Sequence, residues 1–134
     1  MNPQQTIRLS LPSKGRLQDD SMDFLAECGL TVQKLNPRQY QAKMPALPDL
    51  TVLFQRPSDI VVSVRQGSVD FGITGIDVLE EKRGDNGDVI ILHDALGFGH
   101  CSLKLAVPES WTNVTNISSL KKYAGTFDQP LRVA

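Results

Sequence analysis

Two glycine-containing turns carry charged side chains at positions where this sequence could hold an anion. The first, Ser13-Lys14-Gly15-Arg16, follows a short apolar segment and leads directly into a segment with helical periodicity. The N–H groups of a helix start and two cationic side chains can converge there on one anion, and Gly15 lets a ligand approach the backbone. The spacing matches neither the Walker loop nor the GxGxxG fingerprint. The structural alternative is a solvated basic turn.

The second turn runs from Asp70 to Asp77 and reads DFGITGID. Gly72 and Gly75 keep side chains out of the way, and Thr74 offers a hydroxyl group. The N–H groups after Gly75 would form a second helix start that can receive an anion. The two aspartates could orient a sugar hydroxyl or a Mg²⁺-bound water, and their structural alternative is an ordinary role at a strand end and a helix start.

A third cation, Arg56, stands immediately before a predicted helix. Its planar guanidinium suits bidentate contact with a phosphate or carboxylate better than a lysine would. The alternative is a surface ion pair with Asp59, which would be worth little. Further along, the segment from Gly97 to Gly99 encloses an aromatic residue between glycines and is either a hinge between lobes or a plain loop.

Composition excludes several classes of function. The chain has 134 residues, 40% of them hydrophobic, and a net charge of -1 from 14 basic and 15 acidic residues. This balance predicts no nucleic-acid or membrane partner. With neither a signal peptide nor a long apolar run, we expect a cytoplasmic protein. Cys28 and Cys101 lack metal-ligand spacing and are expected to be free, buried thiols, and His93 and His100 to be structural or exposed.

Alternating strand and helix patterns predict an α/β fold with a mainly parallel sheet, whose ligands lie beyond the carboxyl ends of the strands. Proline at the first helical position and a terminal glycine favour a helix from Arg56-Pro57 to Gly67, although its β-branched content favours a strand. The other predicted helices cover 17–28, 76–83 and 117–123. Strands or extended segments are predicted at 7–11, 32–35, 39–43, 50–54, 70–74, 89–93, 101–107 and 131–134.

Four separated motifs together resemble the amino-terminal half of the ATP phosphoribosyltransferase family. They are LPSKGRL followed by DDS at 19–21, QRPSDI at 55–60, VDFGITGIDVLEE at 69–81 and LGFGHCSLKLAVP at 96–108. The resemblance implies a two-lobed fold like that of type II periplasmic binding proteins. It also implies an enzyme, a glycosyltransferase of the first step of histidine biosynthesis. In that reaction N1 of the ATP adenine displaces pyrophosphate from phosphoribosyl pyrophosphate, with Mg²⁺ as the cofactor.

The resemblance also implies roles for individual residues. Lys14, Gly15 and Arg16 would bind phosphate, and Arg56 would bind a nucleotide or a regulatory anion. The remaining expected substrate-binding residues are Asp70, Gly72, Thr74, Gly75, Asp77 and Cys101. Ser102 departs from the family, which usually has arginine at this position. An anion contact here would need Lys104, on the same strand face, in place of that arginine.

The expected organisation is a first lobe at 1–97 and a crossover strand with the start of a second lobe at 98–134. The family's ribose-phosphate loop would lie beyond residue 134, so the chain is expected to be a fragment that is inactive alone. A homo-oligomer and an accessory regulatory subunit are the expected protein partners. The alternatives are a cytoplasmic sensor that binds a small anion and a non-catalytic subunit of the same fold.

Overall fold

The computed structural model describes residues 6–133, which divide into two compact units. The first unit ends at His100 and the second begins at Cys101. None of the helices in the described range is both long and apolar enough to cross a membrane.

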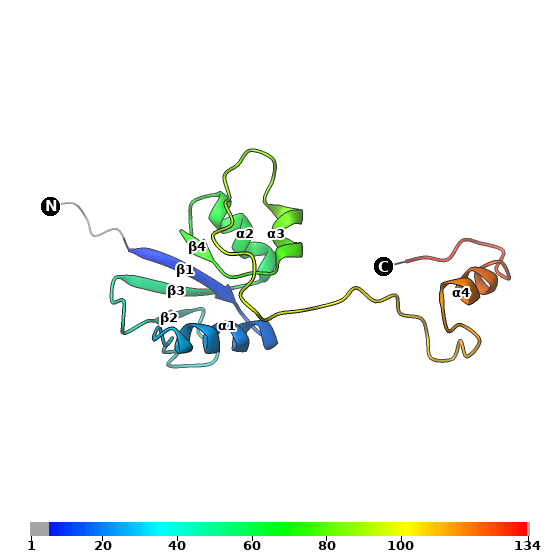
Figure 1. The fold of residues 1–134 in the computed structure, drawn as a ribbon, viewed down its shortest axis with the longest axis horizontal. Helices are drawn as coiled ribbons and strands as arrows, with labels where there is room; N and C mark the ends of the chain where they lie inside the picture. The colour runs from blue at the N-terminus through cyan, green and yellow to red at the C-terminus, as the bar shows by residue number, and fades with distance from the viewer. Residues whose placement is uncertain (1–5, 134) are drawn as a thin grey trace. The chain divides into compact units, whose positions relative to one another are not determined.

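The first unit is built on one mixed, mostly parallel sheet, as the sequence predicted (Figure 1). β1 is a central strand, parallel to β3 on one side and to β4 on the other. β2 is antiparallel to β3 and lies at the edge of the sheet. Pro45 and Pro48 follow it closely, and a proline has no N–H group to donate to a neighbouring strand. The strands, in sheet order, are β2 (Gln41–Lys43), β3 (Leu50–Gln55), β1 (Ile7–Pro12) and β4 (Phe71–Gly72).

The four predicted helices are confirmed, with bounds shifted by one or two residues. They are α1 (Arg16–Glu27), α2 (Pro57–Arg65), α3 (Ile76–Lys82) and, in the second unit, α4 (Ile117–Ala124). Pro57 occupies the first turn of α2, and Gly67 follows its end with φ of 72°, a value that favours glycine. The end signals thus outweighed the β-branched content of this segment.

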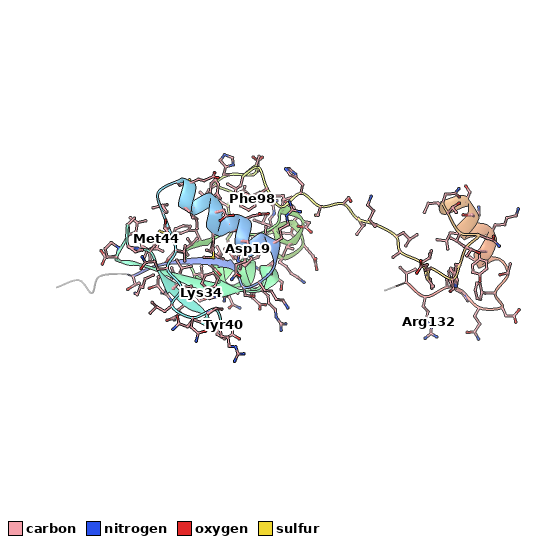
Figure 2. All side chains as sticks on the ribbon, turned by 90° about the horizontal axis from the view of Figure 1, so that it is seen from below. Asp19, Lys34, Tyr40, Met44, Phe98 and Arg132 are labelled. Atoms are coloured by element: carbon pink, nitrogen blue, oxygen red, sulfur yellow. The ribbon has the colours of Figure 1, made fainter. Side chains whose placement is uncertain are left out.

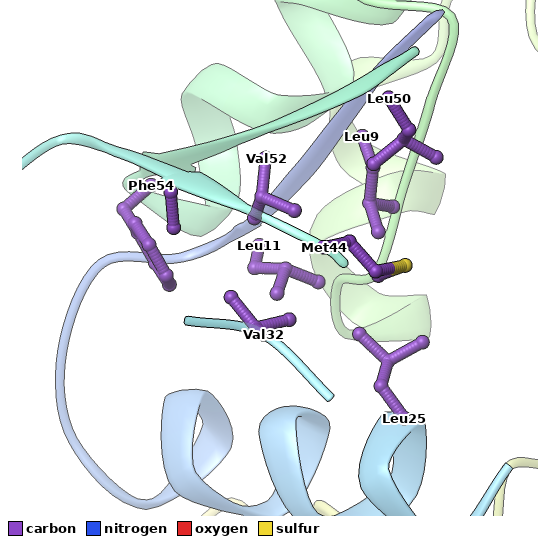
Figure 3. Close-up of a cluster of buried hydrophobic side chains, with 9 residues drawn as sticks. Leu9, Leu11, Leu25, Val32, Met44, Leu50, Val52 and Phe54 are labelled. Atoms are coloured by element: carbon purple, nitrogen blue, oxygen red, sulfur yellow. The ribbon is translucent and has the colours of Figure 1, made fainter. Parts of the chain in front are cut away.

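The hydrophobic core lies between α1 and one face of the sheet (Figure 3). Alternate residues of a strand point to opposite faces, so Leu9 and Leu11 face α1 while Ser10 faces away. Leu25 of α1 closes this core from below in Figure 3. The complete cluster of buried residues is Leu9, Leu11, Leu25, Val32, Ala42, Met44, Leu50, Val52 and Phe54.

α2 covers the opposite face of the sheet and buries Ile60 and Val61. Gly72 is required for this packing, because a Cβ there would lie 2.5 Å from Cγ2 of Ile60 and 3.0 Å from the carbonyl oxygen of Ser10. Helices on both faces are what a mainly parallel sheet needs.

Three strand predictions and one burial prediction are wrong within the described residues. The segments 89–93, 101–107 and 131–133 form no strand there, and residue 134 lies outside the described range. Leu103 is fully exposed, and Ile90 is 75% exposed. A β-strand requires a neighbouring strand to which it is hydrogen-bonded, and within residues 6–133 none of these segments has such a neighbour. The thiols of Cys28 and Cys101 are free as expected, but both residues are exposed rather than buried.

The second unit contains α4 and a small aromatic cluster. A capping box begins the helix: Asn116 accepts from the N–H of Ser119, and the Ser119 hydroxyl accepts from the N–H of Asn116. The ring of Trp111 lies 4.8 Å from that of Tyr123, and Phe127 packs against both. This cluster joins the loop before α4 to the turn after it.

Candidate functional site

Three strand-to-helix turns leave the same edge of the sheet, at its carboxyl end. β1 leads into α1 through residues 13–15, β3 leads into α2 at Arg56, and β4 leads into α3 through residues 73–75. The strands are adjacent and parallel in the order β3-β1-β4, so the first turn lies between the other two. The topology therefore brings together the two glycine-containing turns and the arginine that sequence analysis singled out.

The first turn combines a glycine conformation with exposed cations. Gly15 precedes α1 with φ of 75°, which favours glycine, and no side chain caps the helix start. The first N–H groups of a helix lack an intrahelical acceptor, so those of Arg16 and Leu17 remain donors. Lys14 is exposed, and the Arg16 side chain is 93% exposed, with its Nε 3.6 Å from Oδ2 of Asp20. The turn can therefore offer N–H groups and two cations to an anion.

Arg56 begins α2 with an extended backbone, and its exposed side chain makes no ion pair within residues 6–133. The backbone carbonyl of Arg56 accepts from the N–H groups of Asp59 and Ile60, as expected at a helix start. Asp59 thus contributes to the helix start through its backbone, and the guanidinium is available to a ligand.

The third turn, residues 73–75 within the segment from Asp70 to Asp77, has a different electrostatic character. The Asp77 side chain lies over Gly75, where a Cβ would collide with its Oδ1, so the first turn of α3 already carries a carboxylate. Thr74 donates its hydroxyl to the carbonyl oxygen of Pro57, at 3.2 Å. This turn is suited to accepting hydrogen bonds from ligand hydroxyl or amino groups rather than to holding a phosphate.

Asp70 lies away from the three turns. It precedes β4, and its Oδ2 accepts the backbone N–H of Arg8 at 2.7 Å, while its own N–H donates to the Arg8 carbonyl. Since Leu9 is opposite Phe71, Asp70 lies toward the amino end of the strand pair. Its carboxylate has the structural role that was the alternative in the sequence analysis.

Hydrogen bonds tie the turns to the neighbouring strands and to α2. The N–H of Ser13 donates to the carbonyl of Gln55 at 2.8 Å, and the N–H of Ile73 donates to the carbonyl of Ser10 at 3.0 Å. With the bond from Thr74 to Pro57, every turn is tied to a neighbour. The edge is consequently a connected framework.

Sequence reasoning missed four polar side chains that are fully or partly buried. Ser10 is fully buried and donates its hydroxyl to Oε1 of Gln55 at 2.7 Å, and Nε2 of Gln55 donates to the Ser63 hydroxyl at 3.0 Å. The amide nitrogen of Gln18, in the first turn of α1, is buried without a partner among the described residues. A polar residue in an otherwise apolar strand, such as Ser10, was the available signal.

The segment 97–99 packs against α1 in the first unit. The Phe98 ring lies 5.7 Å from that of Phe24, and a Cβ at Gly99 would meet Leu17 at 3.0 Å (Figure 2). Cys101 belongs to the second unit, and its expected place among the substrate-binding residues stays a prediction. No group of three His, Cys, Asp or Glu residues suited to a metal ion occurs within residues 6–133.

Comparison with known proteins identifies relatives along almost the whole chain. A family model described as "HisG: ATP phosphoribosyltransferase" matches residues 56–134. ATP phosphoribosyltransferase 2, chloroplastic, of Arabidopsis thaliana is 49% identical over 97% of this chain, which covers 32% of that relative. ATP phosphoribosyltransferase of Chelativorans sp. is 37% identical over 91% of this chain, which covers 54% of it.

Among solved structures, the chain is similar to the ATP phosphoribosyl transferase (HisG:HisZ) complex from Thermotoga maritima. The TM-score is 0.47 at 28% identity, with 59% of this chain and 36% of that chain covered. The chain thus spans about a third of the plant relative and about half of the bacterial one. The family match covers more than half of the chain and includes Arg56 and the third turn. The chain therefore belongs to the ATP phosphoribosyltransferase family.

Proposed function

We propose that this chain forms one part of an ATP phosphoribosyltransferase, which condenses ATP with phosphoribosyl pyrophosphate in the first step of histidine biosynthesis. The products are N1-(5-phosphoribosyl)-ATP and pyrophosphate. The single observation that carries the proposal is the connected edge of three turns, with Lys14, Arg16 and Arg56 exposed on it, in a chain of this family. The complete enzyme adopts, in this proposal, the two-lobed fold of type II periplasmic binding proteins.

The roles of the three turns follow from their chemistry. Both substrates carry phosphate groups, and negative charge accumulates on the pyrophosphate as its bond to C1 breaks. The N–H groups and cations of the first turn can hold the phosphates of ATP or the departing pyrophosphate, and Arg56 adds a bidentate donor. The third turn, with its acceptor groups, orients hydroxyl or amino groups of a substrate. N1 of neutral adenine carries its own lone pair, so the attack requires no general base.

Mg²⁺ enters this proposal bound to phosphoribosyl pyrophosphate. Magnesium ions are commonly held by one or two carboxylates together with substrate phosphates, and not by an all-protein cage. Among the described residues of the site, Asp77 is the carboxylate at the third turn. The ion would neutralise phosphate charge, and the chain's own residues would orient the ligands.

Titration calorimetry tests the proposal on this chain and on a longer chain that spans the whole length of its relatives. We expect ATP to bind to this chain and both substrates to bind to the longer one. We expect pyrophosphate release only from the longer chain, because positioning both substrates supplies much of the rate. Binding of anions without transfer by the longer chain would support the alternatives, a small-anion sensor or a non-catalytic subunit. The proposal is refuted if neither this chain nor the longer chain binds ATP.

The cytoplasmic location and the protein partners belong to the same proposal. The Arabidopsis relative is described as chloroplastic, which concerns that protein. Homo-oligomer formation and an accessory subunit remain predictions, and light scattering of the longer chain, alone and with its candidate subunit, tests them.

A further inference from the structure

Three polar side chains behind the edge of three turns form a chain of hydrogen bonds, which we call the relay. It runs from Ser10 in β1 through Gln55 at the end of β3 to Ser63 in α2, with bonds of 2.7 and 3.0 Å. Ser10 is completely buried, and the other two residues are partly buried. Three apolar side chains of similar size could fill this space without any need for hydrogen bonds. The relay therefore calls for an explanation beyond packing.

The same residues hold the turns through their backbone groups. The Gln55 carbonyl accepts the N–H of Ser13, and the Ser10 carbonyl accepts the N–H of Ile73. The side-chain bond between Ser10 and Gln55 thus connects the two residues that anchor the first and third turns. A shift of either strand along its axis would break this bond.

The relay also fixes α2 relative to β3. Gln55 immediately precedes Arg56, the residue that begins α2, and its amide group bonds to Ser63 two turns further along that helix. This bond restrains rotation of the helix about its axis. The direction in which Arg56 leaves the edge depends on that rotation.

We propose that Gln55, through Ser10 and Ser63, is a positioning residue that fixes the first turn and Arg56 in the arrangement that binds an anionic substrate. Gln55 does not touch the ligand in this proposal. Its two directional hydrogen bonds set the relative positions of strand, turn and helix, which apolar contacts alone would leave free to slide. The ligand part of this inference rests on the proposed function.

The test compares two variants that separate positioning from stability. Gln55→Met retains the length of the side chain but removes both bonds. The triple variant Ser10→Ala/Gln55→Met/Ser63→Ala removes every polar member, and replacing all partners by apolar groups is often close to neutral for stability. Ser68→Ala is the matched control, because it removes a hydrogen bond to the backbone carbonyl of Ser63 and leaves the three polar side chains in place.

Amide hydrogen exchange of the ligand-free chain gives the first readout. In both relay variants we expect exchange at Ser13 and Ile73 to become about tenfold faster, the factor that corresponds to losing one typical hydrogen bond, while the central amides of β1 and β3 keep their rates in the triple variant. Unchanged exchange at Ser13 and Ile73 in the triple variant would overturn the proposal.

ATP affinity gives the second readout. We expect the dissociation constant to rise about five- to tenfold in the triple variant even where its melting temperature matches that of the parent chain, and to remain unchanged in Ser68→Ala. Full affinity in a stable triple variant would show that the relay only stabilises the fold and would overturn the proposal. If the parent chain binds no ATP, the proposed function fails, and the exchange rates alone decide whether Gln55 positions the turns.

Discussion

Replacing Arg16 by alanine should weaken ATP binding strongly while leaving the fold almost unchanged. The Arg16 side chain is 93% exposed, and its only ion pair among the described residues is the 3.6 Å contact with Asp20 on the next turn of α1. Such a pair contributes about 0.3–0.5 kcal/mol to folding. A charge-assisted hydrogen bond to a phosphate is worth roughly 1.5–3 kcal/mol, so we expect the dissociation constant to rise by about tenfold to a hundredfold.

Titration calorimetry and thermal unfolding measure the two effects on the same samples. Arg8→Ala is the matched control, since Arg8 is also exposed and lies near the amino end of β1, the opposite end of that strand from the first turn. Asp20→Asn should have the opposite effect on ATP affinity, because it removes the carboxylate that pairs with Arg16. We expect the affinity to rise by about twofold, which corresponds to the small free energy of such an ion pair. Equal ATP affinity for the Arg16→Ala chain and the parent would refute the assignment of the first turn to phosphate binding.

Three further predictions concern other parts of the chain. Gly72→Ala should lower the free energy of unfolding by about 1–3 kcal/mol in urea titrations, because its Cβ would overlap Ile60. Asn116→Ala should destabilise α4 by about 1 kcal/mol through loss of the capping box, which faster amide exchange in that helix would reveal. Cys28 and Cys101 should both react with a thiol reagent in the folded protein because both are exposed, and thiol-blocked mass spectrometry should show no internal disulfide.

Controls separate each of these effects from general damage. Gly125→Ala is suitable for the glycine prediction, because Gly125 has φ of -66° and a Cβ there would lie 3.4 Å from the nearest backbone atom. Asn86→Ala controls for loss of an asparagine, since the side chain of Asn86 lies in an exposed turn and donates to Asp88 there. A Gly72→Ala chain as stable as the parent would contradict the close packing of α2 on the sheet, and unchanged exchange in α4 of Asn116→Ala would contradict the role of the cap. Reaction of only one thiol would contradict the exposure of both cysteines.

The sequence predicted best the elements that are determined by local signals. Pro57 and Gly67 bracket α2 because both act on the backbone at the helix ends, and the turn at Gly15 requires a positive φ that glycine provides. The mainly parallel sheet followed from the alternation of strands and helices. These features need no knowledge of distant contacts.

Features that depend on distant partners were predicted poorly. The alternating segment 101–107 has the pattern of a strand, but periodicity does not supply the neighbour with which a strand must pair. Two interpretations of Asp70 stayed open, a substrate contact and a structural role, because the bond of its carboxylate to the backbone of Arg8 joins residues far apart in the sequence. The relay through Gln55 was missed for the same reason, since its three members lie on three different elements.

The central position of β1 has a consequence for the order in which the sheet assembles. Among the described strands β1 comes first in the sequence, both of its neighbours come later, and its Ile7 pairs with Leu50. β2 and β3 are close in sequence and antiparallel, so they can pair early, and α1 can form locally. We therefore expect β1 to remain without partners until β3 has formed. The segment that leads into the first turn is then among the last parts of the first unit to become ordered during folding.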